Sequence, residues 1–214
     1  MQTDIAGIRK SYSQKTLSED DIEANPFGQF ERWWKEAMLS NIEEVNAMTL
    51  ATASADGVPS ARIVLLKGYS EEGFIFYTNY DSYKGRQLLE NPKACLVFFW
   101  KELERQIRIT GIVQKTSKAD SDAYFQSRPY ESRIGAAASP QSSPVESRDW
   151  LEKRYGQLKE ELNGKEIERP GNWGGYIVKP VIFEFWQGRL SRLHDRIEYS
   201  LQNNGQWNTQ RLAP

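Results

Sequence analysis

The chain has 214 residues, enough for one large domain with its own hydrophobic core. Its 28 Lys and Arg nearly balance 29 Asp and Glu, which disfavours a general surface for nucleic acid or for an acidic membrane. With a single Cys and a single His, the chain forms no internal disulfide and we expect no metal site. No apolar run has the length of a signal peptide or a membrane span, so we expect a soluble, cytoplasmic protein.

The N-terminal residues 1–25 are polar and predict a mobile arm, which is followed by one domain over residues 26–214. Asn25-Pro26 predicts the start of a helix. The helical spacing of the aromatic and apolar residues after it predicts a stripe in the core, made by Phe27, Phe30, Trp33, Trp34 and Met38.

From residue 47 the pattern changes to that of short strands. Asp56-Gly57 is a strong hairpin signal, and Asn91-Pro92 ends a short helix over 82–92. The strands are predicted at 47–54, 58–67, 74–80, 94–100, 105–115, 176–188, 189–200 and 206–212.

Two more helices are predicted between these strands. The first covers 117–128 and begins at Ser117; the second covers 143–162, with Ser143 as N-cap and Glu146 completing a capping box. Hairpin-linked strands with a few helices predict an α+β fold that is mainly β, an antiparallel barrel with helices added. A Rossmann domain is disfavoured because no βαβ series and no glycine-rich phosphate motif is present.

Cations in apolar strands indicate anion sites, since an unpaired charge is costly there. Arg62 and Lys67 bracket four aliphatic residues, and their odd separation puts them on opposite faces of a regular strand. Thr78, Ser82 and Lys84 surround a helix start and could form a phosphate cradle. Salt bridges to acidic residues, or long side chains that reach solvent from a strand end, explain each segment as well.

A second group of polar side chains recurs every four residues: Tyr124, Arg128 and Ser132. Together they could hold one phosphate, although a helix cap with a surface arginine explains them too. Gln141 and Ser142 precede a predicted helix, which indicates either an anion site or simple capping. Trp186 could lie in the core or flank a planar ring.

The only histidine, His194, stands between Arg192 and Arg196. In an extended strand these three side chains share one face, which makes sense mainly if a negatively charged group lies beside them. Two neighbouring cations favour the neutral imidazole. A lone strand histidine is nevertheless often structural.

Several motifs, in order, resemble the pyridoxamine 5′-phosphate oxidase family, the FMN enzymes of vitamin B6 metabolism. They run over almost the whole chain: IRKSY, RIVLLK, FYTN, LERQ, YFQSRP, QSS, WGG, EFWQG, RLHDR and RLAP. The resemblance implies an FMN-binding split β-barrel and a homodimer with two FMN sites at the interface, built from both subunits.

The resemblance also implies the site residues. Those for FMN are Arg62, Ile63, Val64, Leu65, Leu66, Lys67, Tyr77, Thr78, Tyr83, Lys84, Gln106, Gln141, Ser142, Trp186 and Arg196. Those for the substrate are Arg9, Tyr12, Lys67, Tyr124, Arg128, Ser132, Arg192 and His194, of which Arg192 and His194 face the substrate pyridine as the catalytic pair. The family usually has Arg where this chain has Tyr83, so phosphate binding would depend more on Arg62 and Lys84.

The implied reaction is oxidation of pyridoxine 5′-phosphate or pyridoxamine 5′-phosphate to pyridoxal 5′-phosphate. A hydride passes from C4′ to flavin N5, O₂ reoxidises the flavin to give H₂O₂, and the amine substrate releases ammonia. Three alternatives stay open: a split-barrel flavin reductase, a non-catalytic flavin or pyridoxal-phosphate carrier, and a nucleic-acid module. The near-neutral charge weighs against the last.

Overall fold

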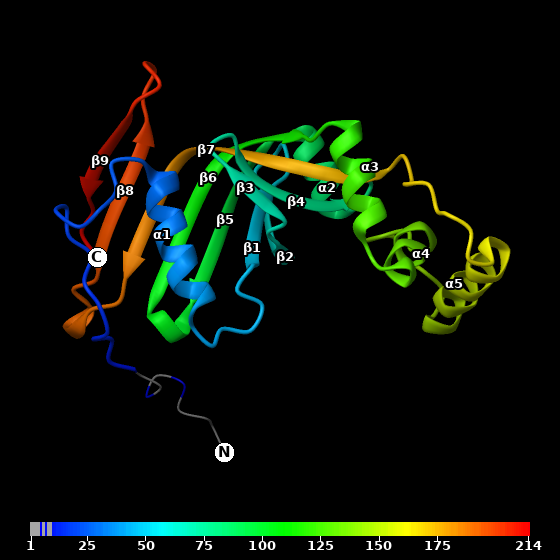
Figure 1. Cartoon of the computed structure of the whole chain (residues 1–214), viewed down its shortest axis with the longest axis horizontal. Coiled ribbons are helices and arrows are strands. Elements are labelled where there is room, and N and C mark those ends of the chain that lie inside the picture. The colour runs from blue at the N-terminus through cyan, green and yellow to red at the C-terminus, as the bar shows by residue number, and fades with distance from the viewer. Residues whose placement is uncertain (1–4, 6, 8–9) are drawn as a thin grey trace. The chain divides into compact units, whose positions relative to one another are not determined.

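The computed structural model describes residues 5, 7 and 10–214. Its elements follow in the order shown in Figure 1: α1 (Pro26–Met38), β1 (Ala47–Ala53), β2 (Pro59–Leu65), β3 (Gly68–Ser70), β4 (Gly73–Asn79), α2 (Tyr83–Glu90), β5 (Lys93–Trp100), β6 (Arg105–Lys115), α3 (Lys118–Ser127), α4 (Tyr130–Ala138), α5 (Arg148–Leu162), β7 (Trp173–Gln187), β8 (Asp195–Leu201) and β9 (Trp207–Arg211). Short 3₁₀ helices cover Lys101–Leu103 and Leu190–Arg192.

The strands hydrogen-bond in the order β2-β1-β5-β6-β7-β4-β3, and β8 pairs with β7 and with β9. The pairings of β4 with β7, of β7 with β8 and of β8 with β9 are antiparallel. The predicted class, an antiparallel split barrel of the α+β type, is confirmed.

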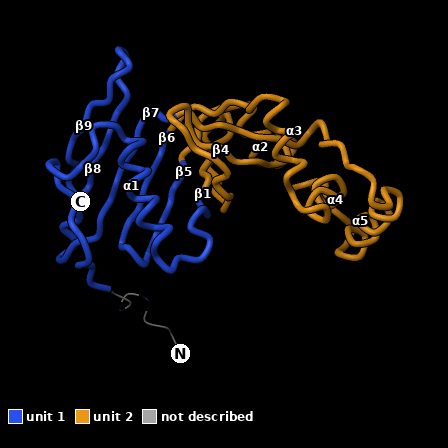
Figure 2. Tube along the Cα trace, in the orientation of Figure 1, with its two compact units in different colours: residues 1–49, 96–110, 180–214 blue, residues 50–95, 111–179 orange. Residues whose placement is uncertain are grey.

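The chain divides into two compact units, coloured separately in Figure 2. Unit 1 comprises Met1–Thr49, Leu96–Thr110 and Pro180–Pro214; unit 2 comprises Leu50–Cys95 and Gly111–Lys179. The division into an arm of residues 1–25 and a domain of residues 26–214 stays a prediction.

In unit 1, α1 begins where the sequence predicts. The Asn25 side chain accepts a hydrogen bond from the Phe27 N–H and caps the helix. Phe30 and Trp33 are buried and pack against Phe98 of β5 and Phe185 of β7, with ring centroids 5.6 and 5.3 Å apart. The prediction that Met38 belongs to this buried stripe is wrong, because Met38 is exposed. The last buried residue is Ala37, and the next residue of a helix points about 100° away from it around the axis.

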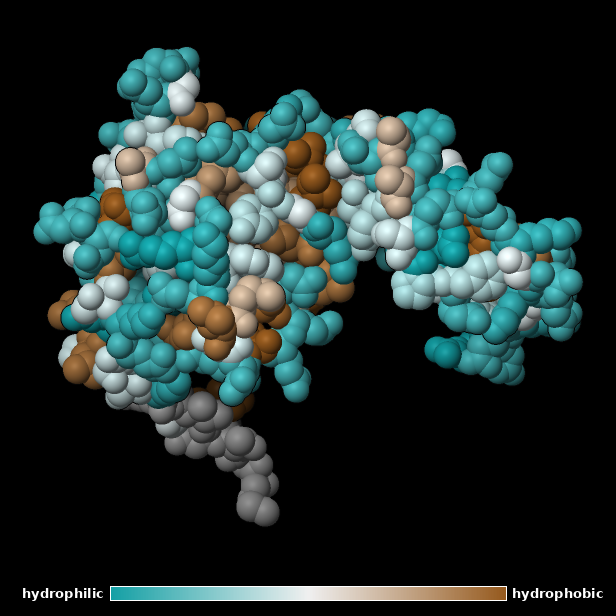
Figure 3. All heavy atoms as spheres, in the orientation of Figure 1, coloured by the Kyte–Doolittle hydropathy of each residue, from teal (hydrophilic) through white to brown (hydrophobic). Residues whose placement is uncertain are grey.

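In unit 2, a small core lies under α3 and α4. Phe125, Ile134, Ile167 and Trp173 are buried together. Gly175 in β7 allows this packing, since a Cβ there would lie 2.8 Å from the Tyr77 ring. The outer helix α5 has no buried residue, and on the face seen in Figure 3 its surface is mostly hydrophilic.

One predicted helix start differs from the structure, and one helix was not predicted. The cap at Ser143 is wrong: α5 is capped by Ser147, which accepts from the Trp150 N–H, while Ser143 N–H closes a turn onto Pro140 O. Both serines precede helix-compatible residues, and the helix begins only after Ser147. The helix α4 has no counterpart in the sequence prediction, since Pro129 and Gly135 interrupt its pattern.

The strand over 189–200 is also wrong in its first half. Leu190–Arg192 form a 3₁₀ turn, and Ser191 and Arg192 have φ values of 56° and 62°. The strand starts only at Asp195. The alternation argument for Arg192, His194 and Arg196 therefore does not apply, and any grouping of these side chains has another cause.

Candidate active site

Unit 2 contains a cavity of about 440 Å³ between β2, β4, α2 and α3. Eleven of the residues implied by the resemblance line it: Ile63, Val64, Leu65, Lys67, Tyr77, Thr78, Lys84, Tyr124, Arg128, Ser132 and Gln141. Pro129 and Trp173 line it as well, and the sequence analysis did not single them out. The WGG motif was the available signal for Trp173.

One end of this cavity is cationic and rich in hydroxyl groups. The Lys84 ammonium is buried and donates to Thr78 Oγ1 at 3.2 Å and to Ser82 Oγ at 3.5 Å. Ser82 caps α2 and accepts from the Gly85 N–H. Burial, together with the neighbouring Arg62 cation, lowers the pKa of Lys84 below its usual value. An anion here would relieve that penalty.

Arg62 does not line this cavity. Its guanidinium donates to Thr52 Oγ1 and Ser60 Oγ, both at 2.6 Å, and burial lowers its pKa. Lys67 follows the end of β2 and lines the cavity. Arg62 and Lys67 thus have different surroundings, as predicted. The reason given for it, alternation along a regular strand, does not extend to Lys67, because β2 ends at Leu65.

The second predicted group also meets in this cavity. Tyr124 comes from α3, Arg128 from its C-cap and Ser132 from α4. The Arg128 guanidinium lies 4.6 Å from the Trp173 ring centroid, and its buried NH1 has no hydrogen-bond partner among the described residues. Burial lowers the pKa of Arg128.

Aromatic rings form one wall of the same cavity. Tyr77 stacks on Tyr124 with centroids 3.7 Å apart and on Trp173 at 5.7 Å. Burial raises the pKa of Tyr77, so its phenol is neutral at pH 7. This wall gives planar ligands a surface beside the cations.

Gln141 is oriented toward the hydroxyl end. Its Oε1 accepts from Thr78 Oγ1 and from the Asn79 N–H, both at 3.3 Å. Ser142, in a left-handed conformation with φ 68°, does not line the cavity. Leu66 is buried outside the lining, and Tyr83 is exposed in the first turn of α2.

Unit 1 contains a second cavity, also about 440 Å³, with three of the remaining predicted residues around it. Tyr12, Arg192 and His194 line it, and Arg189, which the sequence analysis did not select, lines it too. Arg9 lies outside the described residues. Thus a turn with positive φ, and not strand alternation, brings Arg192 and His194 together.

The His194 ring is fixed in position and charge. Its Nδ1 accepts from the Arg189 N–H at 3.0 Å, so the neutral ring carries its proton on Nε2. The ring lies 4.6 Å from that of Trp186. Burial, with the Arg192 cation, lowers the pKa of His194 against the opposing effect of Asp195. This lowered pKa agrees with the neutral imidazole expected from the sequence, although burial lowers the pKa more than the Arg192 cation does.

Arg196 lies apart from Arg192 and His194. It stands opposite Trp186 in the β7–β8 register, donates from Nε to Glu184 Oε1 at 3.0 Å and from NH1 to Ala213 O at 2.7 Å. Hydrogen bonding to Glu184 raises its pKa. Gln106 is half-buried in β6.

Within residues 5, 7 and 10–214, no group of three or more His, Cys, Asp or Glu side chains could hold a metal ion. In the same part of the chain, no helix is both long and apolar enough to cross a membrane.

Comparison with known proteins agrees with the resemblance. Residues 34–160 match the family described as Pyridoxamine 5′-phosphate oxidase, and residues 173–214 match the Pyridoxine 5′-phosphate oxidase C-terminal dimerisation region. Proteins named pyridoxine/pyridoxamine 5′-phosphate oxidase are 52% identical in Trichormus variabilis, over 100% of both chains, and 54% identical in Bordetella petrii, over 98% of this chain and 99% of that one.

Solved structures show the same fold. The structure of PhzG from Burkholderia lata 383, in complex with tetrahydrophenazine-1-carboxylic acid, has a TM-score of 0.89 at 30% identity and covers 96% of this chain and 100% of that one. A pyridoxamine 5′-phosphate oxidase-related, FMN-binding protein from Nostoc punctiforme has a TM-score of 0.70 at 17% identity, over 90% of this chain and 100% of that one. The chain belongs to the pyridoxamine 5′-phosphate oxidase family.

Proposed function

We propose that this protein is an FMN-dependent oxidase that converts pyridoxine 5′-phosphate and pyridoxamine 5′-phosphate to pyridoxal 5′-phosphate. O₂ is the electron acceptor and H₂O₂ the product, with ammonia released from the amine. The full-length relatives named pyridoxine/pyridoxamine 5′-phosphate oxidase support the substrate class.

The observation that carries the proposal is a set of cations without carboxylate partners. Among the described residues, Arg62, Lys67, Lys84 and Arg128 form no ion pair with Asp or Glu, although the chain has 29 acidic residues. Lys84 is buried, Arg128 is half-buried, and both line the cavity. Cations withdrawn from water are normally paired, so ligand anions would be their partners, while the exposed Lys67 and the half-buried Arg62 would add positive charge nearby. Cations at Lys84 and at Arg128 fit two phosphates, one on the flavin and one on the substrate.

The residues around Lys84 suit FMN. Thr78, Ser82 and the start of α2 surround the ammonium with hydroxyl and N–H groups, which are phosphate ligands. When bound, FMN supplies a two-electron acceptor that O₂ reoxidises. The roles proposed for Ser142, Leu66, Gln106 and Trp186 follow the resemblance.

The substrate phosphate would bind to Lys67, Tyr124, Arg128 and Ser132. The unpartnered NH1 of Arg128 then gains an acceptor, and the Tyr124 and Ser132 hydroxyls donate to the remaining oxygens. Binding there would orient the pyridine ring for reaction.

Arg192 and His194 would act on the substrate pyridine. With Nδ1 occupied by the Arg189 N–H, His194 presents Nε2–H, which is a hydrogen-bond donor. The imidazole is therefore suited to holding a substrate oxygen or nitrogen in place, and less to removing a proton. Arg192 adds positive charge beside it.

We further propose a homodimer. The match of residues 173–214 to a C-terminal dimerisation region supports it, and this region comprises β7, β8 and β9. The resemblance places FMN at an interface between subunits, so the groups in unit 1 and unit 2 of one chain need not serve the same ligand molecule.

The test compares three reactions of the purified protein with added FMN. We expect pyridoxine 5′-phosphate to give equal amounts of pyridoxal 5′-phosphate and H₂O₂, and unphosphorylated pyridoxine to react poorly. Oxidation of NADPH without formation of pyridoxal 5′-phosphate would indicate a flavin reductase. A bound flavin without turnover of any of these substrates would indicate a carrier. Either result would overturn the proposal.

A further inference from the structure

The segment that carries Tyr12 is held in place by a buried carboxylate outside the proposed site. We infer that Glu104 is a positioning residue, which fixes residues 10–14 so that Tyr12 lies beside His194. This inference rests on the proposed function insofar as Tyr12 contacts substrate.

Glu104 is itself rigidly placed. It follows a 3₁₀ helix in the left-handed conformation, with φ 54° and ψ 41°, and its side chain is 3% exposed. Its carbonyl oxygen accepts from the Gly188 N–H at 2.8 Å and from Gln187 Nε2 at 3.2 Å. The carboxylate is thus anchored to the end of β7, beside Trp186.

Within the described part of the chain, this carboxylate contacts only the N-terminal segment. Oε2 accepts from the Ser13 N–H at 2.8 Å and from the Gln14 N–H at 3.1 Å, and Oε1 lies 3.4 Å from Lys10 Nζ. Two consecutive amides converge on one buried oxygen and define the path of the backbone immediately after Tyr12. Hydrogen bonds to an ionised acceptor are about twice as strong as neutral ones.

Tyr12 packs closely against Gly188, Trp186 and His194. A Cβ at Gly188 would lie 2.7 Å from Tyr12 Cβ, so the lack of a side chain at Gly188 allows Tyr12 to approach. The Tyr12 ring meets Trp186 edge-on at 5.8 Å and lies 6.0 Å from the His194 ring. A shift of residues 13–14 would therefore move Tyr12 within the proposed site.

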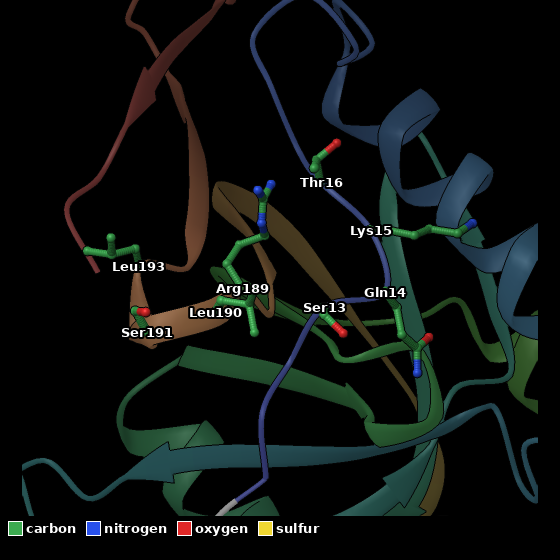
Figure 4. Close-up of a pocket in the computed structure, with 8 residues that line it drawn as sticks. All are labelled: Ser13, Gln14, Lys15, Thr16, Arg189, Leu190, Ser191 and Leu193. Carbon is green, nitrogen blue, oxygen red and sulfur yellow. The ribbon is translucent and has the colours of Figure 1, made fainter.

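After Tyr12, the side chains of residues 13–16 are exposed and pack little. A cavity of about 370 Å³ separates residues 13–16 from the loop 189–193, and Figure 4 shows these two segments on its opposite sides. Lys15 points away from the loop toward α1, where it pairs with Glu36. The Gln14 side chain donates from Nε2 to Glu102 O at 2.9 Å, and Leu17 is buried, with its N–H donating to Asp195 at 3.1 Å. Glu104 is therefore the group that binds the backbone N–H groups immediately after Tyr12.

The test uses Glu104→Ala and Glu104→Gln, with Glu102→Gln as a matched control. Glu102 is exposed in the same turn and its side chain pairs with Lys101. Its backbone carbonyl accepts from Gln14 Nε2, and the substitution keeps that carbonyl. Loss of the carboxylate removes charge-assisted bonds, so we expect Glu104→Ala to raise KM for pyridoxine 5′-phosphate about tenfold. The kcat and the FMN content should stay near the wild-type values. In Glu104→Gln the side-chain carbonyl still accepts from both backbone N–H groups, so this variant should largely restore KM.

A second readout does not depend on activity. Limited trypsin digestion at the bonds after Lys10 and Lys15 should be faster in Glu104→Ala than in wild type, Glu104→Gln or Glu102→Gln. If Glu104→Ala does not fold, Ser13→Pro removes one of the two amide donors and should reproduce both effects.

Unchanged trypsin cleavage in the Ala variant would overturn the anchoring role. Faster cleavage with an unchanged KM would overturn the effect on substrate binding, and a loss of kcat and FMN in the Ala variant that Gln does not restore would indicate a structural role instead. If the wild type does not oxidise pyridoxine 5′-phosphate, the proposed function fails separately, and the cleavage rates still decide the anchoring.

Discussion

Replacing Lys84 by Met separates ligand binding from folding at the hydroxyl-rich end of the unit 2 cavity. Met keeps the length and the apolar stem of the side chain and removes only the cation. In the ligand-free protein, Lys84 contacts two hydroxyls, at 3.2 and 3.5 Å, and burial beside Arg62 lowers its pKa.

Two effects of Lys84→Met on the stability of the protein have opposite signs: the loss of two hydrogen bonds and the removal of a buried cation. The two long hydrogen bonds are worth about 1 kcal/mol together, while burying a cation without an anionic partner costs at least as much. Thr78 and Ser82 keep other partners, Gln141 and Gly85, so no group is left unpaired. The free energy of unfolding without FMN should therefore change by less than about 1 kcal/mol or rise.

FMN binding should weaken strongly, because the phosphate loses a charged donor worth about 1.5–3 kcal/mol, or roughly 10- to 150-fold in Kd. Urea unfolding of the apoprotein and fluorescence titration with FMN measure the two quantities. Lys93→Met, at an exposed position at the start of β5, is the control and should leave both unchanged. An apoprotein destabilised by more than about 2 kcal/mol, with FMN affinity within about threefold of wild type, would refute the reasoning.

Three further changes test other parts of the site. The pKa of His194 is lowered from 6.5, so the ring is neutral at pH 7 and kcat/KM should fall only in more acidic solution. Arg192→Gln removes a cation that lowers this pKa, so the acid limb of the pH–rate profile should move up toward 6.5. An acid limb that does not move would exclude His194 as its source. Tyr83→Arg adds a cation in the first turn of α2 and should tighten FMN binding roughly fivefold in the same titration, an expectation that equal affinities would contradict. Glu184→Ala leaves Arg196 without its carboxylate, so it should lower the free energy of unfolding in urea by about 2 kcal/mol and weaken FMN binding. If Glu184→Gln restores the FMN affinity but not the stability, the hydrogen bond to Arg196 matters more for FMN binding than the charge.

Most elements could be predicted because their signals are local. Asn25-Pro26, Asp56-Gly57 and Ser117 each act within a few residues, and the structure places a helix start, a hairpin and a helix cap at them. Ser143 and Ser147 offer the same local chemistry, and the turn that Ser143 closes onto Pro140 has no distinctive sequence signal, so the choice between them could not be predicted.

The grouping of the site residues could be predicted only in part. Periodicity correctly joined Tyr124, Arg128 and Ser132 in one cavity, even though two helices and a cap supply them. Strand alternation joined Arg192 and His194 for the wrong reason, because positive φ at a non-glycine residue has no simple sequence signal. The roles of Arg189 and Glu104 depend on a backbone N–H and on a carboxylate that accepts backbone N–H groups, which no residue pattern reveals.

The most direct test of the account is the absorbance spectrum of the FMN-loaded protein under anaerobic conditions. On addition of pyridoxine 5′-phosphate, we expect the oxidised flavin band to bleach with formation of one pyridoxal 5′-phosphate per flavin, and to return when O₂ is admitted. A flavin that stays oxidised with saturating pyridoxine 5′-phosphate and pyridoxamine 5′-phosphate, or a protein that does not retain FMN, would contradict the account.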